Sequence, residues 1–484
     1  MVAKEFIVAI ELGSSKVTGI AGQKNLDGSI TVLAVAKEPS STFIRKGVVY
    51  NIDKTAQCLQ SIKSKLEKQL NTRITQVYVG VGGQSVRGVR NVVAKDLPAG
   101  AIVTDAMIDE LIYANQEVKH QYPDQEILDT STQEYKVDTQ LQYDPVGIQC
   151  NRIEGNYLNI LQRKSFYKNF NKCFEVANIK IAEILNAPRA LAEVVLTEAE
   201  RRSGCVLIDM GADTTTVSVY SKNILRHLAV IPLGGANITK DIATLQMEEH
   251  DAEKMKLKYA SAYTDNNEID NTLKYPIDQD RQVDSRRFIE IVEGRLEEII
   301  ENAWYQVPNE YYQSLLGGII LTGGGANMKN IEQACANYTN LEKIRIAKYP
   351  TMPINGGNDD IKAKNGMMNT VLGLLAKGDY NCAGGPLTGN DLFEQTKPTG
   401  AEATDQRPAR KAGEVSEGVV LSEAEKQKAE EEARKKVEDE ARQKAEEEAA
   451  RKAEEERIRK ENSRWNKFKK VASKFVKGMV EDEE

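Results

Sequence analysis

The stretch CVLIDMGADTTTVSVY at residues 205–220 decides the fold, because the same chain contains an earlier counterpart of it. It reads as a strand, a glycine turn and a second strand, and AIELGSSKVTGI at residues 9–20 is organised in the same way. A third glycine-rich stretch, GGIILTGGGANM at 317–328, ends a buried apolar run. This repetition predicts two related halves that face each other across a cleft, with one hairpin from each half holding a polyphosphate.

The three stretches carry the groups that such a ligand needs. Backbone N–H groups and hydroxyls in the first turn suit a phosphate, and a lysine adds positive charge; the residues are Gly13, Ser14, Ser15 and Lys16. The second hairpin offers Asp209, Gly211, Ala212, Asp213, Thr214 and Thr215. In the third, backbone without side chains lets an adenine or ribose lie close, at Gly323, Gly324, Gly325 and Ala326. Each stretch alone is typical of a structural turn, but the three in this order are specific.

Composition sets the broad class. The chain has 484 residues, 40% of them hydrophobic, which is enough for two or more globular units. Its net charge of −7 gives no reason to expect a nucleic-acid partner. The six cysteines are far apart without metal-binding spacing, which favours a reducing cytosol, and we expect neither a signal peptide nor a spanning segment.

The pattern before residue 380 is α/β. Strands are predicted at 6–13, 15–23 and 31–38, and an amphipathic helix at 55–70. Residues 379–421 are rich in Gly, Pro, Thr and charge and predict a flexible linker. Residues 422–462 are mostly Ala, Glu, Lys and Arg, with acids four residues before bases. We favour a solvated helical spacer there over a weak coiled coil, which would need larger apolar residues.

Residues 463–480 predict a helix that lies in a membrane interface. Lysines and arginines flank an apolar stripe that consists of Trp465, Phe468, Val471, Ala472, Phe475 and Met479. The alternative is a helix packed on its own globular domain. Six basic residues without an acid favour an anionic lipid surface.

The order of the glycine stretches resembles the actin, Hsp70 and sugar-kinase superfamily, with its phosphate 1, connect 1, phosphate 2, adenosine and connect 2 motifs. Connect 1 would be NIKIAEILNAPRALAEVVL (178–196), which we expect to be helical. Connect 2 would be NGMMNTVLGLLAKG (365–378), with Gly366 and Gly373 on an apolar helix. The resemblance implies an actin-like two-domain ATPase fold.

Within that superfamily, residues 1 to about 380 resemble FtsA, a bacterial cell-division family. The resemblance rests on IPLGGANITKDIA (231–243), DAEKMKLKYASA (251–262) and EIVEGRLEEII (290–300). It implies that ATP is bound and that further contacts come from Gly234, Gly235, Asn237, Lys240, Glu253 and Lys256. Glu253 and Lys256 are alternatively an exposed helical ion pair.

The family organisation implies four subdomains before the linker. They are 1A (1–85, 163–203 and 361–378), the inserted 1C (86–162), 2A (204–239 and 311–360) and 2B (240–310). In 1C we expect a helix capped at Thr104 or Asp105, and contacts with other division proteins. In 2B the C-terminal peptide of the tubulin-like GTPase FtsZ would meet Arg281, Arg286 and Arg287, which could also form a solvated face.

One departure concerns the metal. Where many superfamily members carry Asp in the first hairpin, this chain has Glu11, and Asp209 remains in the second. Both carboxylates can hold hydrated Mg²⁺ through water, with ATP hydrolysis at most slow. The resemblance implies a filament-forming protein that ties the FtsZ ring to the cytoplasmic membrane at the division site. The alternative is a small-molecule kinase of the same fold, which would have no use for a membrane helix.

Overall fold

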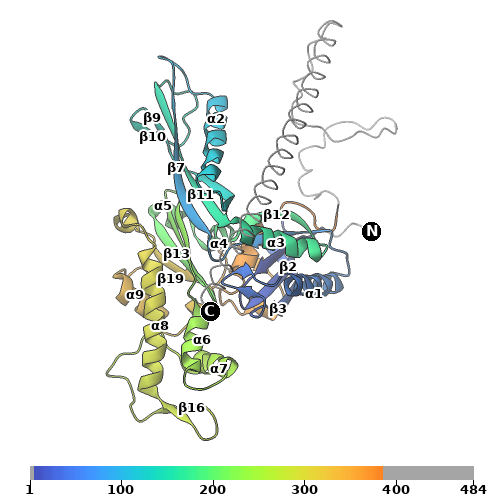
Figure 1. Ribbon diagram of the computed structural model, residues 1–484, viewed down its shortest axis with the longest axis vertical. Coiled ribbons are helices and arrows are strands. Elements are labelled where there is room, and N and C mark those ends of the chain that lie inside the picture. The colour runs from blue at the N-terminus through green and yellow to red at the C-terminus, as the bar shows by residue number, and fades with distance from the viewer. Residues whose placement is uncertain (1–4, 385–484) are drawn as a thin grey trace, which may run out of the picture. The chain divides into compact units, whose positions relative to one another are not determined.

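The computed structural model describes residues 5–384, and Figure 1 traces two β-sheets with helices packed on them. The spacer at 422–462, the amphipathic segment at 463–480 with its six apolar residues, and the linker beyond residue 384 lie outside the described residues. Among the helices of residues 5–384, none combines the length and the apolar character that crossing a membrane requires.

The first sheet contains the first glycine turn. Its strand order is β12–β6–β1–β2–β3–β20, with β1 (Ile7–Leu12), β2 (Lys16–Lys24), β3 (Ile30–Pro39), β6 (Gln76–Val81), β12 (Lys180–Asn186) and β20 (Ile354–Asn355). Strands β1, β2 and β3 run antiparallel, whereas β6 pairs parallel with β1, and β12 pairs parallel with β6. The strands predicted at 6–13, 15–23 and 31–38 are confirmed.

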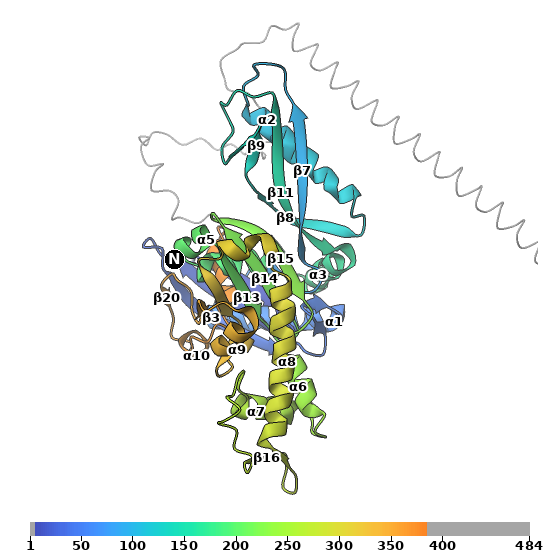
Figure 2. The ribbon, with the colours of Figure 1, turned by 90° about the vertical axis from the view of Figure 1, so that its left-hand side faces the viewer.

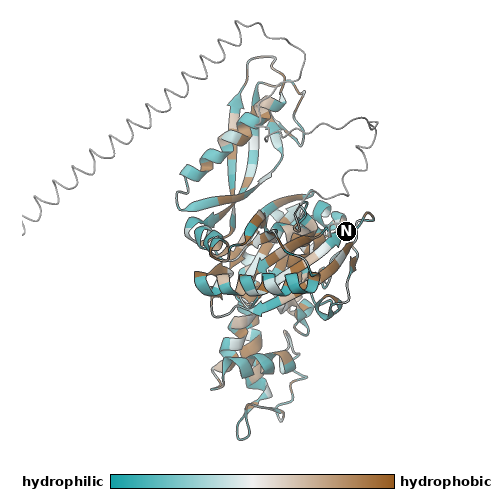
Figure 3. Ribbon diagram, turned by 90° about the vertical axis from the view of Figure 1, so that its right-hand side faces the viewer, coloured by the Kyte–Doolittle hydropathy of each residue, from teal (hydrophilic) through white to brown (hydrophobic). Residues whose placement is uncertain are grey.

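Helices α1 (Ile52–Leu70), α3 (Lys164–Val176) and α11 (Asn369–Lys377) each contribute several residues to the hydrophobic core of this sheet. The amphipathic pattern predicts α1 correctly, because its buried Leu59, Ile62 and Leu66 recur at helical spacing. The helix begins at Ile52, earlier than the predicted 55–70, because the Asn51 side chain accepts from the Lys54 N–H at 3.0 Å and caps it. Figure 3 shows the apolar residues of the strands covered by helices with polar outer faces.

The second sheet repeats the design of the first. Its order is β10–β9–β11–β7–β15–β14–β13–β18–β19, where β13 (Cys205–Met210), β14 (Thr215–Ser221), β15 (Ile224–Ile231), β18 (Gly318–Thr322) and β19 (Ile344–Ile346) form one end. Strands β13, β14 and β15 run antiparallel, and β18 and β19 follow in parallel. This is the arrangement of β1, β2, β3, β6 and β12, so the predicted repeat of two halves is confirmed.

The other end of the second sheet belongs to an inserted subdomain with its own small core. It contains β7 (Arg87–Asp96), α2 (Asp105–Asn115), η1 (Gln116–His120), β8 (Gln125–Thr132), β9 (Tyr135–Val137), β10 (Gln140–Gln142) and β11 (Arg152–Arg163). Helix α2 lies along β7 and β11 in Figure 2, and Thr104 is its cap, as expected. Strand β7 joins the second half where Arg87 pairs with Ala229 of β15.

The remaining elements pack on one of the two sheets or connect the halves. They are α4 (Ala187–Val195), α5 (Glu198–Ser203), α6 (Gly235–Ala243), α7 (Glu249–Tyr259), β16 (Lys274–Pro276), β17 (Gln282–Asp284), α8 (Ser285–Tyr305), η2 (Asn309–Ser314), η3 (Gly325–Asn327), α9 (Ile331–Thr339), α10 (Asp359–Lys362), β4 (Ile44–Arg45) and β5 (Val48–Val49). Helices α6, α7, α8 and α9 share a core with β13, β14 and β18.

Two connecting stretches differ from expectation. The stretch 178–196 is not helical throughout, because β12 occupies its first part, beside β6, and only α4 is a helix. In 365–378, Gly366 precedes α11 in a turn with φ of +77°. Gly373 does allow a close contact, since a Cβ there would lie 2.4 Å from the Ala190 carbonyl oxygen. That contact joins α11 to α4.

The first residues of the predicted linker are packed. The Cys382 N–H donates to the Phe6 carbonyl at 2.8 Å, and the Cys382 carbonyl accepts from the Thr75 N–H at 2.8 Å. The Tyr78 hydroxyl accepts from the Asp379 and Tyr380 N–H groups, both at 2.8 Å. Composition predicts a linker that starts at residue 379. Residues 379–384 instead belong to the first half, because these hydrogen bonds hold them against it.

Candidate nucleotide-binding site

The β1–β2 turn and the β13–β14 turn have the same backbone geometry. In the first, the Gly13 N–H donates to the Lys16 carbonyl at 3.1 Å, and in the second the Gly211 N–H donates to the Thr214 carbonyl at 2.8 Å. A Cβ on Gly13 or Gly211 would lie 2.7 Å or 2.8 Å from these respective oxygens. Both turns therefore require glycine at the same position.

Each hairpin places one carboxylate before its turn, Glu11 on β1 and Asp209 on β13. Burial, and next the Asp209 carboxylate, raise the pKa of Glu11 to about 7, although Lys16 and Lys37 oppose the shift. Burial raises the pKa of Asp209 to about 6. Two poorly solvated carboxylates that repel each other are the environment that a divalent cation relieves.

The donor set fits Mg²⁺ only together with a ligand. Among residues 5–384, no group of three or more His, Cys, Asp or Glu side chains gathers as a metal site. Mg²⁺ commonly uses one or two carboxylates, waters and substrate phosphate oxygens. Glu11 and Asp209 therefore match a magnesium–nucleotide site better than a metal site made by the protein alone.

The third glycine stretch lies against the second hairpin. Gly323 has φ of +84°, and a Cβ there would lie 2.4 Å from the Asp209 Oδ1 atom. A Cβ on Gly325 would lie 2.8 Å from that of Met210. Gly324 differs, because its Cβ would meet nothing nearer than the Met367 sulfur at 3.8 Å. The chain itself does not require glycine at 324, which leaves room for a ligand to approach the backbone.

Met367 is a residue of the site that sequence reasoning missed. The Lys16 Nζ atom lies 3.9 Å from its sulfur, so its side chain stands between Lys16 and Gly324. Burial lowers the pKa of Lys16, with Lys37 as the second cause. No motif pointed to Met367, since an apolar residue in the connect 2 stretch reads as core. Lys37, which pairs with Asp360 at 2.6 Å, was missed because it lies outside the three glycine-rich stretches.

Residues of both turns also hold the protein together. The Ser14 hydroxyl accepts from the Gly47 N–H at 2.8 Å, and Asp213 accepts from the Lys46 N–H at 3.0 Å. The Ser15 carbonyl accepts from the Ser40 N–H at 3.1 Å. A hydroxyl can still donate to a phosphate while it accepts, so Ser14 remains available to a ligand.

The start of α6 is fixed on the second turn. The Gly235 N–H donates to the Gly211 carbonyl at 3.0 Å, and the Ala236 N–H donates to the Ala212 carbonyl at 2.7 Å. The Gly234 N–H is taken by the Asn237 side chain at 3.0 Å. The predicted contacts Gly234, Gly235 and Asn237 thus lie beside Gly211 and Ala212, where they position the turn.

Glu253 and Lys256 are not an ordinary exposed ion pair. The Lys256 Nζ atom lies 2.7 Å from Glu253, and its side chain is only 11% exposed. It also donates to the Gly235 carbonyl at 3.0 Å and to the Thr239 hydroxyl at 2.8 Å. The Thr239 hydroxyl in turn donates to Glu253. Together these bonds fasten α7 to the first turn of α6, next to the second glycine turn.

Three predicted contacts are placed differently. Thr215 is buried and donates its hydroxyl to the Leu233 carbonyl at 2.9 Å, so it supports the hairpin. The Ala326 side chain is buried in the core of the second half. Lys240 is exposed on α6, and no hydrogen bond or ion pair joins its side chain to another described residue. Of the two neighbouring threonines, only Thr214 has a side chain that is left for a ligand. At Ala326 only the backbone is left.

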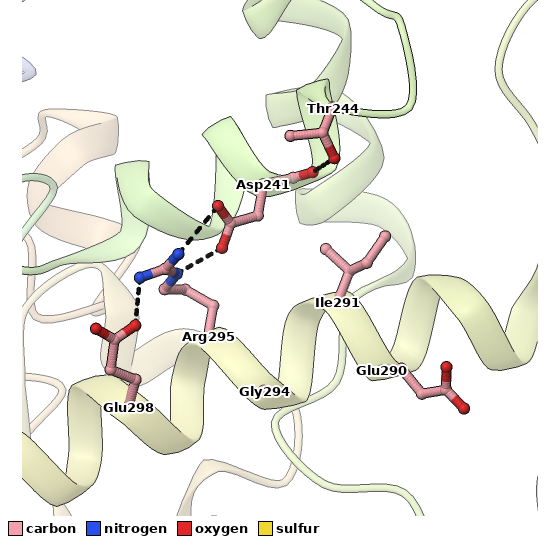
Figure 4. A pocket seen from close by; sticks show the side chains of 7 residues that line it. All are labelled: Asp241, Thr244, Glu290, Ile291, Gly294, Arg295 and Glu298. Carbon is pink, nitrogen blue, oxygen red and sulfur yellow. Dashed lines mark hydrogen bonds and ion pairs between the residues drawn. The ribbon is translucent and has the colours of Figure 1, made fainter.

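A groove lies between α6 and α8 (Figure 4), and none of the three arginines expected to meet a partner peptide lines it. Arg281 pairs with Asp278 and donates to the Gln246 carbonyl at 2.9 Å, and Arg286 donates to Asn271 at 2.7 Å. Arg287 is exposed and has no such partner among residues 5–384. The groove, of about 320 Å³, is lined by Asp241, Thr244, Glu290, Ile291, Gly294, Arg295 and Glu298, which sequence reasoning did not single out.

Comparison with known proteins gives consistent matches along the chain. A family model described as cell division protein FtsA matches residues 206–373, and one described as the SHS2 domain inserted in FtsA matches residues 83–161. The cell division protein FtsA of Porphyromonas gingivalis is 31% identical over 71% of this chain and 73% of its own. That of Neisseria meningitidis serogroup B is 31% identical over 77% of this chain and 90% of its own.

A solved structure supports the fold independently. A chain of the PilM–PilN type IV pilus biogenesis complex superposes with a TM-score of 0.54 at 15% identity, covering 77% of this chain and 98% of that one. At this identity the likeness concerns the fold alone. With the repeated strand order and the matched insertion, it confirms the actin-like fold with an inserted subdomain.

Proposed function

Because the chain belongs to the FtsA family of bacterial cell-division proteins, we propose that it binds ATP with Mg²⁺ between its two glycine turns and assembles into filaments. We further propose that these filaments tie the FtsZ ring to the inner face of the cytoplasmic membrane and recruit other division proteins through the inserted subdomain. Family membership favours this function over the small-molecule kinase of the same superfamily.

The observation that carries the nucleotide proposal is the pair of matching turns. One comes from each half, and both keep glycine where any side chain would strike a carbonyl oxygen. Lys16 follows the first turn as the cation for a phosphate, and Gly324 leaves open space at the end of β18 for the adenosine. Each half therefore supplies part of one polyphosphate site.

Glu11 and Asp209 would hold Mg²⁺ through water. When bound, the cation would neutralise phosphate charge and the two carboxylates together. The longer Glu11 side chain positions its carboxylate less tightly than an aspartate would, so we expect ATP binding with at most slow hydrolysis. The residues of this chain thus favour retention of the nucleotide over rapid turnover.

The groove between α6 and α8 is our proposed dock for the FtsZ C-terminal peptide. Arg287, Ile291, Gly294 and Glu298 recur at helical spacing, so they share one face of α8. Ile291, labelled with Gly294 in Figure 4, offers an apolar contact, and a Cβ on Gly294 would meet nothing within 4 Å. Arg295 is already engaged by Asp241 and Glu298, whereas Arg287 is available to a peptide carboxylate.

An Arg287→Glu variant tests this dock. It should weaken binding of a synthetic FtsZ C-terminal peptide about tenfold, measured by fluorescence anisotropy, because an attractive charge becomes repulsive. The matched control is Arg73→Glu, since Arg73 is also exposed and lies in the first half. Equal affinity of the two variants would place the peptide elsewhere.

The whole function is tested by co-sedimentation of the full chain with FtsZ and anionic vesicles, with and without ATP. ATP should increase the amount of both proteins on vesicles, because a filament presents many weak membrane contacts at high effective concentration. A chain ending at Lys460 lacks the predicted amphipathic segment and should lose the vesicles but keep ATP binding. Vesicle binding unchanged by that truncation would show that the anchor is elsewhere.

A further inference from the structure

The two-residue turn between β4 and β5 contacts both glycine turns. Lys46 and Gly47 form it with φ of 51° and 71°. The Gly47 N–H donates to the Ser14 hydroxyl of the first half at 2.8 Å. The Lys46 N–H donates to Asp213 of the second half at 3.0 Å. This turn is therefore one place where a hydrogen bond, from the Lys46 backbone N–H to the Asp213 carboxylate, joins the two halves beside the candidate nucleotide site.

The same turn is packed against residues 82–85, the segment that leads into the inserted subdomain and is called its root below. The Lys46 carbonyl accepts from the Gln84 N–H at 2.8 Å. A Cβ on Gly83, which has φ of +86°, would lie 2.5 Å from the Gly47 carbonyl oxygen. Gly83 and Gln84 lead directly into β7, so backbone touches backbone where the inserted subdomain begins.

The far strand of the subdomain ends at the same root. The Arg163 N–H, at the end of β11, donates to the Ser85 hydroxyl at 3.2 Å. The Gln162 side chain donates to the Gly82 carbonyl at 3.3 Å. A shift of residues 82–85 is thereby passed to both long strands of the subdomain.

Other contacts attach the subdomain to the second half. Glu134, in the turn after β8, forms a buried ion pair with Arg226 of β15. Arg90 of β7 contacts both Glu310 and Tyr311. The second half thus holds the subdomain through the Arg87–Ala229 strand pairing and these side chains, and the first half contacts it through the β4–β5 turn. Its position depends on the separation of the halves.

We propose that the β4–β5 turn relays nucleotide occupancy to the inserted subdomain. This inference rests on the proposed ATP site. ATP held by both glycine turns fixes the halves at the separation at which the Lys46 N–H reaches Asp213. When the halves move apart, that bond is lost while the Gly47–Ser14 bond, which lies within the first half, stays. The turn then moves with the first half alone, and the root packed on Gly83 shifts relative to the second half.

Hydrogen exchange of the full chain with and without Mg–ATP tests the relay. ATP should slow exchange at residues 82–90 and at the end of β11. In Gly83→Ala, a methyl group pushes against Gly47, so ATP should still bind but the slowing should be lost. Gly82→Ala is the matched control, since its Cβ would meet only ordinary contacts at 3.8 Å and 3.9 Å. It should behave like the unaltered chain.

The outcomes separate the two proposals. If the unaltered chain binds a fluorescent ATP analogue but exchange at 82–90 does not change, the relay is wrong and the ATP site stands. If it binds no ATP, both fail. Retained slowing in a folded Gly83→Ala also overturns the relay, and should that variant not fold, the unaltered chain alone decides between these results.

Discussion

The β1–β2 and β13–β14 glycine turns have the same backbone geometry but differ in the groups around them. In the first, Lys16 and Lys37 oppose the rise in the pKa of Glu11, and the Ser40 hydroxyl donates to the Gly13 carbonyl at 2.6 Å. The second has Asp209 without such a lysine, and α6 is fastened to its carbonyl groups. The two turns thus have the same shape, but positive charge lies beside the first and a helix is bonded to the second.

The largest effect is expected from the shared glycines. Gly13→Ala and Gly211→Ala each force a Cβ against a carbonyl oxygen, so each should lower the free energy of unfolding by about 2 kcal/mol and abolish ATP binding. Urea denaturation and titration with a fluorescent ATP analogue measure the two effects. Gly357→Ala, whose Cβ would meet nothing within 4 Å, is the control. A harmless substitution at one turn would show that the turns are not equivalent.

The carboxylates come next. Asp209→Ala and Glu11→Ala should each weaken Mg²⁺-dependent ATP binding about tenfold, equivalent to about 1.4 kcal/mol, because each removes one holder of the cation. Binding measured in EDTA should change little. Glu11→Asp should retain binding and raise the rate of phosphate release, since the shorter side chain restores the residue common in the superfamily. A release rate no higher than that of the unaltered chain would remove our explanation for slow hydrolysis.

A smaller effect concerns pH. The folded pKa of Glu11 is raised to about 7 and that of Asp209 to about 6, so the folded state holds protons that the unfolded state has lost. The stability they contribute is present below about pH 4 and is lost as pH rises through 6 to 7. Without ligand, Glu11→Gln should therefore flatten the upper part of this decline in urea denaturation. An unaltered pH profile would contradict the burial of Glu11.

A further prediction concerns Gly324, where the second half would contact the adenosine of ATP. Gly324→Gln should weaken ATP binding without unfolding, because the space beside Gly324 is open to a side chain but needed by the ligand. Gly357→Gln is the matched control. Tight ATP binding by Gly324→Gln would move the adenosine away from the end of β18.

The smallest effect is expected at Lys240. It is exposed, so Lys240→Ala should change the free energy of unfolding by less than about 0.5 kcal/mol. Lys256→Met should destabilise clearly more, because it removes the cation that pairs with Glu253 and one of the donors to the Gly235 carbonyl. If Lys240→Ala and Lys256→Met lower the ATP affinity equally, Lys240 contacts the nucleotide directly. Thermal unfolding of each variant with and without ATP distinguishes a loss of stability from a loss of nucleotide contact.

The sequence predicts the repeated halves well, because glycine turns and apolar strands are local signals. The prediction is weaker where contacts between residues that are distant in sequence determine the local structure. Residues 180–186 form a strand because β6 lies beside them, and 379–384 are ordered because Phe6, Thr75 and Tyr78 bind them.

The site shows the same limit. Motif order brought the two turns and Gly324 together, yet it could not show that Thr215 and Ala326 face inward. Met367 and the α6–α8 groove were missed, since their roles arise from residues that are distant in sequence. Chemistry spread over several elements leaves no short pattern to find.

The packing of residues 379–384 has a mechanical consequence. Tension on the chain beyond this segment enters through Cys382, which is bonded to Phe6 before β1 and to Thr75 before β6. It therefore loads the centre of the first sheet, between two parallel strands, and reaches neither the second half nor the inserted subdomain directly. A protein pulled from this point would carry the load in its first half, and the load would reach the second half only through the contacts between the halves.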